Sequence, residues 1–85
     1  MKQPLVTIYS RTGCHLCENA ESLLTPLAAN LDFALEIKLL DGDKELEDLY
    51  GQLIPVVHVN GKYFSHFRVD LEEFKSFLEK HRQRQ

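Results

Sequence analysis

The 85-residue sequence predicts an α/β domain in which a four-stranded mixed sheet is flanked by helices. Two observations carry this prediction. Short runs rich in β-branched residues alternate with stretches whose apolar residues recur at helical spacing. The third and fourth β-rich runs, Pro55–Val59 and Lys62–Ser65, are separated only by Asn60-Gly61, the strongest short-range hairpin signal. The expected element order is β-α-β-α-β-β-α, in a single domain spanning residues 1–85.

The first half of the chain supplies a strand, a long helical stretch and a second strand. Leu5–Tyr9 is apolar on both faces, as in a strand inside a sheet. Pro26 lies within the helical stretch that begins near Cys14, and it predicts a kink or an early end. Residues 33–40 alternate with period two, which indicates the second strand. Two β-α-β steps are expected along the chain, and the length between the first two strands suits a right-handed parallel crossover. One helical face carries Leu16, Ala20, Leu23, Leu24, Leu27 and Leu31.

Two further helices have start signals in the second half. Asp43 is placed to cap a short helix that runs to about Tyr50, and Gly51 is placed to end it. Asp70, with Glu73 three residues on, has the spacing of a capping box at the start of the last helix. We therefore expect helices on both faces of the sheet.

Composition and charge exclude several classes of function and location. Formal net charge is −3 and the only basic cluster, residues 80–84, reads as a solvated helix end, so nucleic-acid binding is not expected. The first residues lack the apolar run of a signal peptide, and no stretch has a membrane-spanning length. We expect a cytoplasmic protein with no membrane partner. In that reducing compartment two cysteines are more often catalytic or metal-binding than a structural staple.

The pair Cys14 and Cys17 stands where the first strand gives way to the first helix. Residues three apart on a helical turn face the same way, so the two sulfurs can reach bonding distance. The helix N-terminus favours a negative charge on Cys14. Arg11 and His15 flank Cys14, and we expect these surroundings to lower the pKa of its thiol below the free value of about 8.5.

Different depths in the helix predict different roles for the two cysteines. Cys14 should attack a disulfide and form a mixed disulfide, which Cys17 should then resolve. Two alternatives stay open. One is a metal or iron–sulfur module shared between subunits, since a site needs about four ligands and one chain offers two cysteines. The other is a non-catalytic interaction domain whose cysteines are redox-regulated.

The motif from Tyr9 to Cys17, followed later by Ile54-Pro55-Val56, resembles the glutaredoxin and thioredoxin superfamily. It is most similar to small bacterial glutaredoxin-like proteins with a Cys-His-Leu-Cys motif. The resemblance implies a thioredoxin-like fold and thiol–disulfide oxidoreductase activity, with Cys14 as nucleophile and Cys17 as resolving thiol. It also implies a cis Ile54–Pro55 bond beside the sulfurs. The substrate-binding residues that it implies are Arg11, Thr12, Gly13, His15, Ile54 and Pro55.

The same resemblance sets expectations for partners. Arg11 matches a basic residue that glutaredoxins use near the glycine carboxylate of glutathione. Glutaredoxins have a glycine pair before the last helix, where this chain has His66 and Phe67. We therefore expect weaker coupling to glutathione than in an ordinary glutaredoxin. The expected substrate is a disulfide-containing protein or small molecule, with glutathione, another thiol or a reductase as reductant and no bound cofactor or metal.

Overall fold

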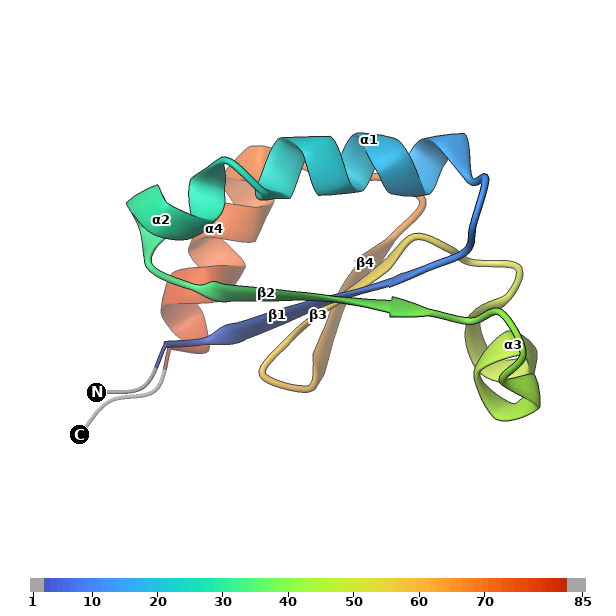
Figure 1. Cartoon of the computed structure of the whole chain (residues 1–85). Coiled ribbons are helices and arrows are strands. Elements are labelled where there is room, and N and C mark those ends of the chain that lie inside the picture. Colours follow the sequence, from blue (N-terminus) through green and yellow to red (C-terminus); the bar gives the residue numbers. More distant parts are fainter. Residues whose placement is uncertain (1–2, 83–85) are drawn as a thin grey trace.

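The computed structural model describes residues 3–82, which form four strands and four helices (Figure 1). No helix within this range is long and apolar enough to cross a membrane. The elements in chain order are β1 (Leu5–Ser10), α1 (His15–Leu24), α2 (Leu27–Leu31), β2 (Ala34–Leu39), α3 (Lys44–Tyr50), β3 (Val56–Val59), β4 (Lys62–His66) and α4 (Leu71–Lys80).

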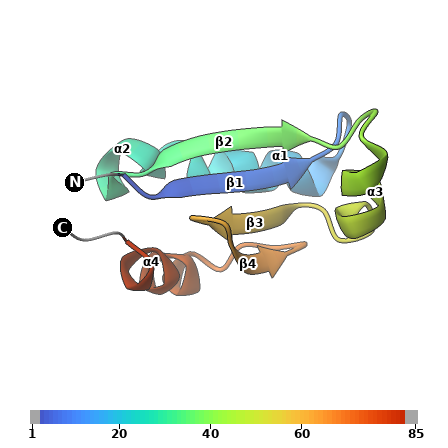
Figure 2. The same ribbon diagram turned by 90° about the horizontal axis from the view of Figure 1, so that it is seen from below.

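The strands form the predicted mixed sheet, in the order β2-β1-β3-β4. β1 and β2 are parallel, whereas β3 is antiparallel to both β1 and β4. Only the first β-α-β step is therefore a parallel crossover. Figure 2 shows why: α3 lies beyond the ends of the strands, so the chain re-enters the sheet from the end at which β2 left it. Asn60 and Gly61 join β3 to β4 with φ angles of 51° and 80°, the two positive values of a type I′ turn.

The main core lies on one face of the sheet. Side chains of β1 and β3 pack there against α1 and α4, with Phe33 at the margin. The helices cover the two faces unequally, because α3 has only seven residues and buries none of them. Tyr50 of α3 reaches the second face at one end, where its ring centroid lies 4.5 Å from that of Tyr9. The fully or almost fully buried core residues are Val6, Ile8, Leu24, Phe33, Val57, Val59, Phe74 and Leu78.

The predicted start and stop signals are in place. Asp43 and Asp70 each accept the backbone N–H three residues on, at 3.1 Å, as N-caps do. Gly51 is the C-cap of α3. The long helical stretch ends at Leu24, and Pro26 then acts as N-cap of the separate helix α2. The expected early end is thus confirmed, and one more helix is present than the sequence predicted.

The basic tail differs from its interpretation as a solvated helix end. The side chain of Arg82 is only 18% exposed. Its guanidinium donates to the carbonyl oxygens of Leu31 at 2.7 Å and Asp32 at 3.2 Å. Arg82 thereby satisfies carbonyls at the end of α2 and ties the C-terminal end of the described chain to that helix. The rest of the tail, residues 83–85, lies outside the described residues.

Candidate active site

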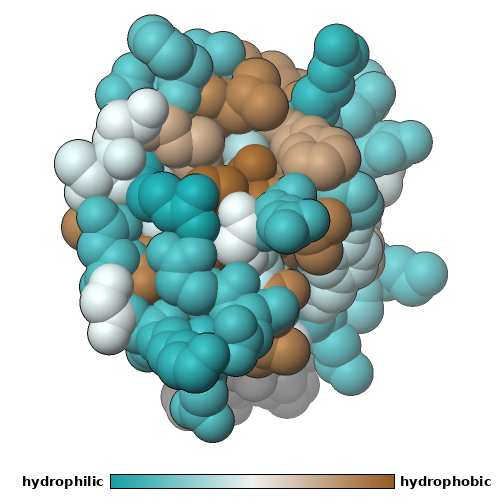
Figure 3. Space-filling model, turned by 90° about the vertical axis from the view of Figure 1, so that its right-hand side faces the viewer, coloured by the Kyte–Doolittle hydropathy of each residue, from teal (hydrophilic) through white to brown (hydrophobic). Residues whose placement is uncertain are grey.

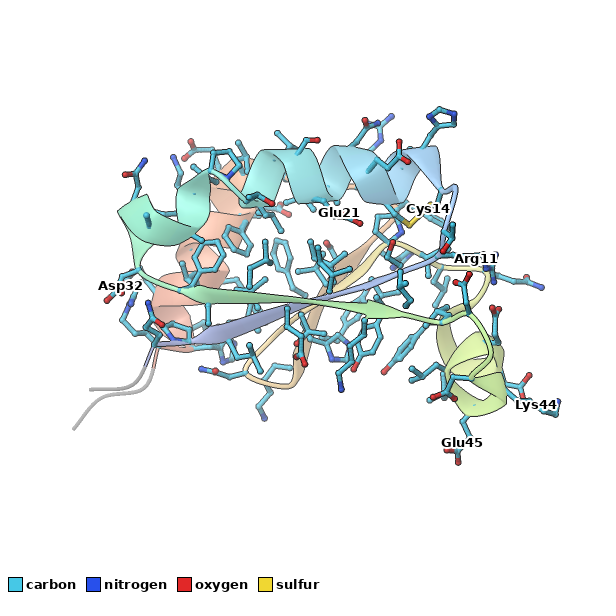
Figure 4. All side chains as sticks on the ribbon, in the orientation of Figure 1. Arg11, Cys14, Glu21, Asp32, Lys44 and Glu45 are labelled. Carbon is cyan, nitrogen blue, oxygen red and sulfur yellow. A yellow bond between two sulfur atoms is a disulfide. The ribbon has the colours of Figure 1, made fainter. Side chains whose placement is uncertain are left out.

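Cys14 and Cys17 are joined as a disulfide at the N-terminal end of α1, with their Cα atoms 5.2 Å apart. Figure 4 shows Cys14 at this end of the helix, with Arg11 below it on the side of α3. Cys14 is the N-cap residue and is partly exposed, whereas Cys17 lies one turn inside and is fully buried. An incoming sulfur therefore meets Cys14 first.

A tight turn delivers Cys14 to the helix. The backbone N–H of Cys14 donates to the carbonyl of Arg11 at 3.2 Å, and Gly13 has φ +80°, which residues with a side chain rarely adopt. The backbone N–H of Cys17 donates to Cys14 Sγ at 3.2 Å. An N–H directed at a sulfur stabilises negative charge on it, so the same contact in the dithiol favours a Cys14 thiolate.

Segments distant in sequence complete the site. Ile54 packs with Leu40 against Cys17, and the Ile54–Pro55 peptide bond is cis, as predicted. The backbone N–H of Phe67 donates to the carbonyl of Pro55 at 3.0 Å, which fixes the loop after β4 beside this segment. Phe67 itself has φ +66°, a left-handed conformation that is uncommon for an aromatic residue.

The loop before Cys14 is held by two carboxylates. The guanidinium of Arg11 forms a two-pronged ion pair with Glu47 of α3: Nη2 pairs with Oε1, and Nε donates to Oε2 at 3.3 Å. The N–H of Thr12 donates to Asp41 Oδ1, also at 3.3 Å. The side chain of His15 is 97% exposed. The sequence had indicated positive potential from both flanking residues. In the structure Arg11 is paired with Glu47 and the imidazole ring of His15 faces solvent.

An apolar patch borders the disulfide. Leu16, Leu53 and Phe67 are each substantially exposed. Leu16 and Phe67 also line a groove between α1 and the loop before α4, together with Leu23 and Val69. Figure 3 shows this end of the molecule, with brown apolar surface gathered in its upper half and teal polar surface around it. Monomeric proteins leave such patches exposed mainly where they bind something.

A cluster of aromatic rings occupies the second face of the sheet. The ring centroid of His58 lies 5.1 Å from that of Tyr9, 5.7 Å from Tyr50 and 6.2 Å from Tyr63. Burial among these rings lowers the pKa of His58 from its ordinary value of 6.5. Tyr9 and Tyr50 also pack against the small cluster that contains Cys17. His58 is therefore part of the packing behind the site.

The predicted site residues meet at one end of the molecule, but two contributors escaped sequence reasoning. Glu47 looked like an ordinary surface carboxylate of a short helix, and nothing in its spacing indicated Arg11 as its partner. Phe67 stood out only through the missing glycine pair. Within residues 3–82, no group of three or more His, Cys, Asp or Glu side chains is arranged to hold a metal ion.

Comparison with known proteins places this geometry in a family. The glutaredoxin-like domain (DUF836) matches residues 5–79. The uncharacterized protein Rv0508 of Mycobacterium tuberculosis is 28% identical over 75 residues, which are 82% of this chain and 77% of that protein.

Two solved structures confirm the predicted thioredoxin-like fold. The NMR structure of protein Ne2328 from Nitrosomonas europaea superposes with a TM-score of 0.78 at 29% identity, covering 91% of this chain and 93% of that one. Fasciola hepatica thioredoxin superposes with a TM-score of 0.66 at 18% identity, covering 94% and 82%, and so shares the fold. Together with the Cys14–Cys17 pair, these similarities support a redox-type function. Because the family match spans nearly all of the sequence, the chain belongs to the glutaredoxin-like domain family.

Proposed function

We propose that this protein is a thiol–disulfide oxidoreductase that uses Cys14 and Cys17 as a dithiol. The observation that carries the proposal is the asymmetry of the pair. Cys14 is partly exposed at a helix N-terminus and accepts an N–H, whereas Cys17 is buried one turn behind it. This arrangement suits a pair in which the exposed thiolate attacks the substrate disulfide and the buried cysteine then attacks the resulting mixed disulfide.

The reaction transfers two electrons by two exchanges. The Cys14 thiolate attacks one sulfur of the substrate disulfide, whose S–S bond breaks as the other sulfur leaves as a thiolate. Cys17 loses its proton and attacks Cys14 Sγ, so that the mixed disulfide breaks and the second substrate thiolate leaves. The substrate gains two electrons and the protein ends as the Cys14–Cys17 disulfide. Glutathione, another thiol or a reductase then restores the dithiol, and running the steps in reverse would oxidise a dithiol substrate.

The surface around the pair suits disulfides in proteins or peptides. The exposed side chains of Leu16, Leu53 and Phe67 offer apolar contact on the rim of the site. Burying apolar area contributes about 25 cal/mol per Å², and a polypeptide substrate supplies more of it than a small polar thiol does. We propose that the protein works on such substrates in the reducing cytoplasm, where its own disulfide can be reduced again.

Single-cysteine variants test the roles. Cys14→Ser should abolish reduction of a protein disulfide such as that of insulin. Cys17→Ser should react once and remain attached to its target, as mass measurement under non-reducing conditions would show. Retention of full turnover by Cys14→Ser would refute the assignment. Absorbance spectra and metal analysis of freshly purified protein would reveal a metal or cluster bridging two chains, and folded protein without turnover would indicate a regulated interaction domain.

A further inference from the structure

The donors on the loop before Cys14 are already engaged by carboxylates of the same chain. Arg11 is the cation nearest to Cys14 on this loop, and Glu47 faces it with both carboxylate oxygens. The N–H of Thr12, on the same loop, points at Asp41. Both acids follow β2 in sequence and come from the segment that contains α3. An anion approaching Cys14 from this side therefore meets a paired guanidinium and a second carboxylate.

The space around the ion pair is fitted to it. A Cβ atom on Gly51 would lie 2.5 Å from the carbonyl oxygen of Glu47, 2.8 Å from Glu47 Oε1 and 3.3 Å from Arg11 Nη2. Gly51 has an ordinary helical φ of −53°, so the backbone conformation does not require glycine here. A Cβ at this position would instead clash with the backbone carbonyl of Glu47 and crowd the ion pair beside it. Both side chains are partly shielded from solvent, which weakens the competition of water and salt for Arg11.

We propose that Glu47 is a specificity-determining residue that excludes carboxylate-bearing thiols and disulfides from Cys14. A substrate carboxylate can bind Arg11 only by displacing Glu47, and it is otherwise repelled by Asp41 and Glu47 together. Disulfides flanked by neutral or apolar groups meet no such barrier and can use the apolar patch. The inference rests on the proposed function in one respect only: it takes Cys14 as the nucleophile.

Alkylation of the reduced protein tests the inference without requiring disulfide turnover. Iodoacetate is an anion and iodoacetamide is its neutral analogue, and both alkylate the same thiolate. The ratio of their rates at Cys14 therefore reports the local electrostatic barrier and cancels any change in thiolate concentration. Glu47→Gln keeps an oxygen to accept from Arg11 and removes the negative charge. We expect it to raise the ratio of the iodoacetate rate to the iodoacetamide rate by about three- to ten-fold, which is the effect of removing one unit charge that solvent partly screens.

Asp48→Asn is the matched control. It removes the same charge from the next residue of the same helix, where Asp48 lies 3.6 Å from Lys44. We expect it to change the ratio by less than about two-fold, because the charge of Asp48 is exposed to solvent and paired with Lys44. Arg11→Gln should abolish the gain when it is combined with Glu47→Gln, since the uncompensated positive charge of the guanidinium is what attracts the anion.

Turnover of two small disulfides extends the test to substrates. Hydroxyethyl disulfide is neutral, and dithiodipropionate is a dianion of similar size. Glu47→Gln should raise the rate with the dianion relative to the neutral disulfide by the same factor. The inference would be overturned if the alkylation ratio were unchanged in Glu47→Gln or rose equally in Asp48→Asn. In either case, turnover of the neutral disulfide would still support the proposed function. Failure of both reagents to alkylate Cys14 would overturn the proposed function and the inference with it.

Discussion

Phe67 occupies a backbone conformation that favours glycine, and substitution there can separate backbone from side-chain effects. Its φ is +66°, and a left-handed conformation costs a residue with a Cβ about 1–2 kcal/mol. Glycine escapes that cost but loses about 0.5–1 kcal/mol more chain entropy on folding than alanine does. Phe67→Gly should therefore be more stable than Phe67→Ala by about 0.5–1 kcal/mol, although both variants lose the ring.

The ring contributes in addition. Phe67 is 45% exposed, so about half of the roughly 1.5–3 kcal/mol of a fully buried phenylalanine is at stake. Phe67→Ala should unfold more easily than the wild type by about 0.75–1.5 kcal/mol, and Phe67→Gly by about 0.5 kcal/mol, since relief of the left-handed conformation offsets part of the loss.

Urea denaturation of the three proteins measures these differences as shifts in midpoint at constant slope. Tyr63 provides the control pair, because it is similarly exposed, at 51%, and lies in β4. At that position glycine should be less stable than alanine by about 0.5–1 kcal/mol, which is the opposite sign. If alanine proved as stable as glycine at position 67, the reasoning from the backbone conformation would be wrong.

Two further predictions concern titration. The Cys14 thiol of the reduced protein should ionise below the free-thiol pKa of about 8.5, because the helix N-terminus and the N–H of Cys17 favour its thiolate. Ultraviolet absorbance of the thiolate against pH, with Cys14→Ser as the blank, measures this pKa. A titration midpoint at or above the free-thiol value would contradict the prediction. Since burial lowers the pKa of His58 in the folded state, the unfolded chain takes up the proton first, and stability should decline as pH falls through 6.5. The urea midpoint of His58→Gln should decline less over that range than that of the wild type, and His15→Gln, at an exposed position, should follow the wild type.

Local signals predicted most of the elements. The hairpin followed from Asn60-Gly61, and the helix starts followed from Asp43 and Asp70, since these residues act on the backbone within a few positions of themselves. The break at Pro26 was visible for the same reason. The Cys14–Cys17 site was visible because both sulfurs lie on one helical turn and need no distant partner to be recognised.

Contacts between distant segments escaped prediction because no local pattern records them. Arg82 looked like part of a solvated tail, yet it caps carbonyls that lie about fifty positions earlier in the sequence. Glu47 was one acid among several on a short helix until the fold brought it to Arg11. The antiparallel entry of β3 likewise depends on α3 lying beyond the sheet, which is a property of packing and not of residue spacing.

The structure offers glutathione few free groups at the places where the family resemblance would put its contacts. Arg11 is paired with Glu47. Phe67 stands in the loop where glutaredoxins have glycines, and its backbone N–H already donates to the carbonyl of Pro55. Asp70 accepts the N–H of Glu73 and so serves the first turn of its own helix. Each of these features predicts slow reaction with glutathione mixed disulfides.

The preference between glutathione and protein substrates is tested by comparing a glutathione mixed disulfide of a peptide with an internal disulfide of a protein. Both are reduced at matched concentrations of the enzyme. The wild type should favour the protein disulfide. Combining Glu47→Gln with Phe67→Gly should raise the glutathione rate by about ten-fold or more, because one change leaves the charge of Arg11 uncompensated and the other removes a bulky side chain from the loop. The rate with the protein disulfide should not rise, since neither change adds apolar contact. Rapid, saturable turnover of the glutathione substrate by the wild type would show that a paired Arg11 and an aromatic residue at position 67 do not hinder glutathione. The hypothesis that charge and access at this site discriminate against glutathione would then be wrong.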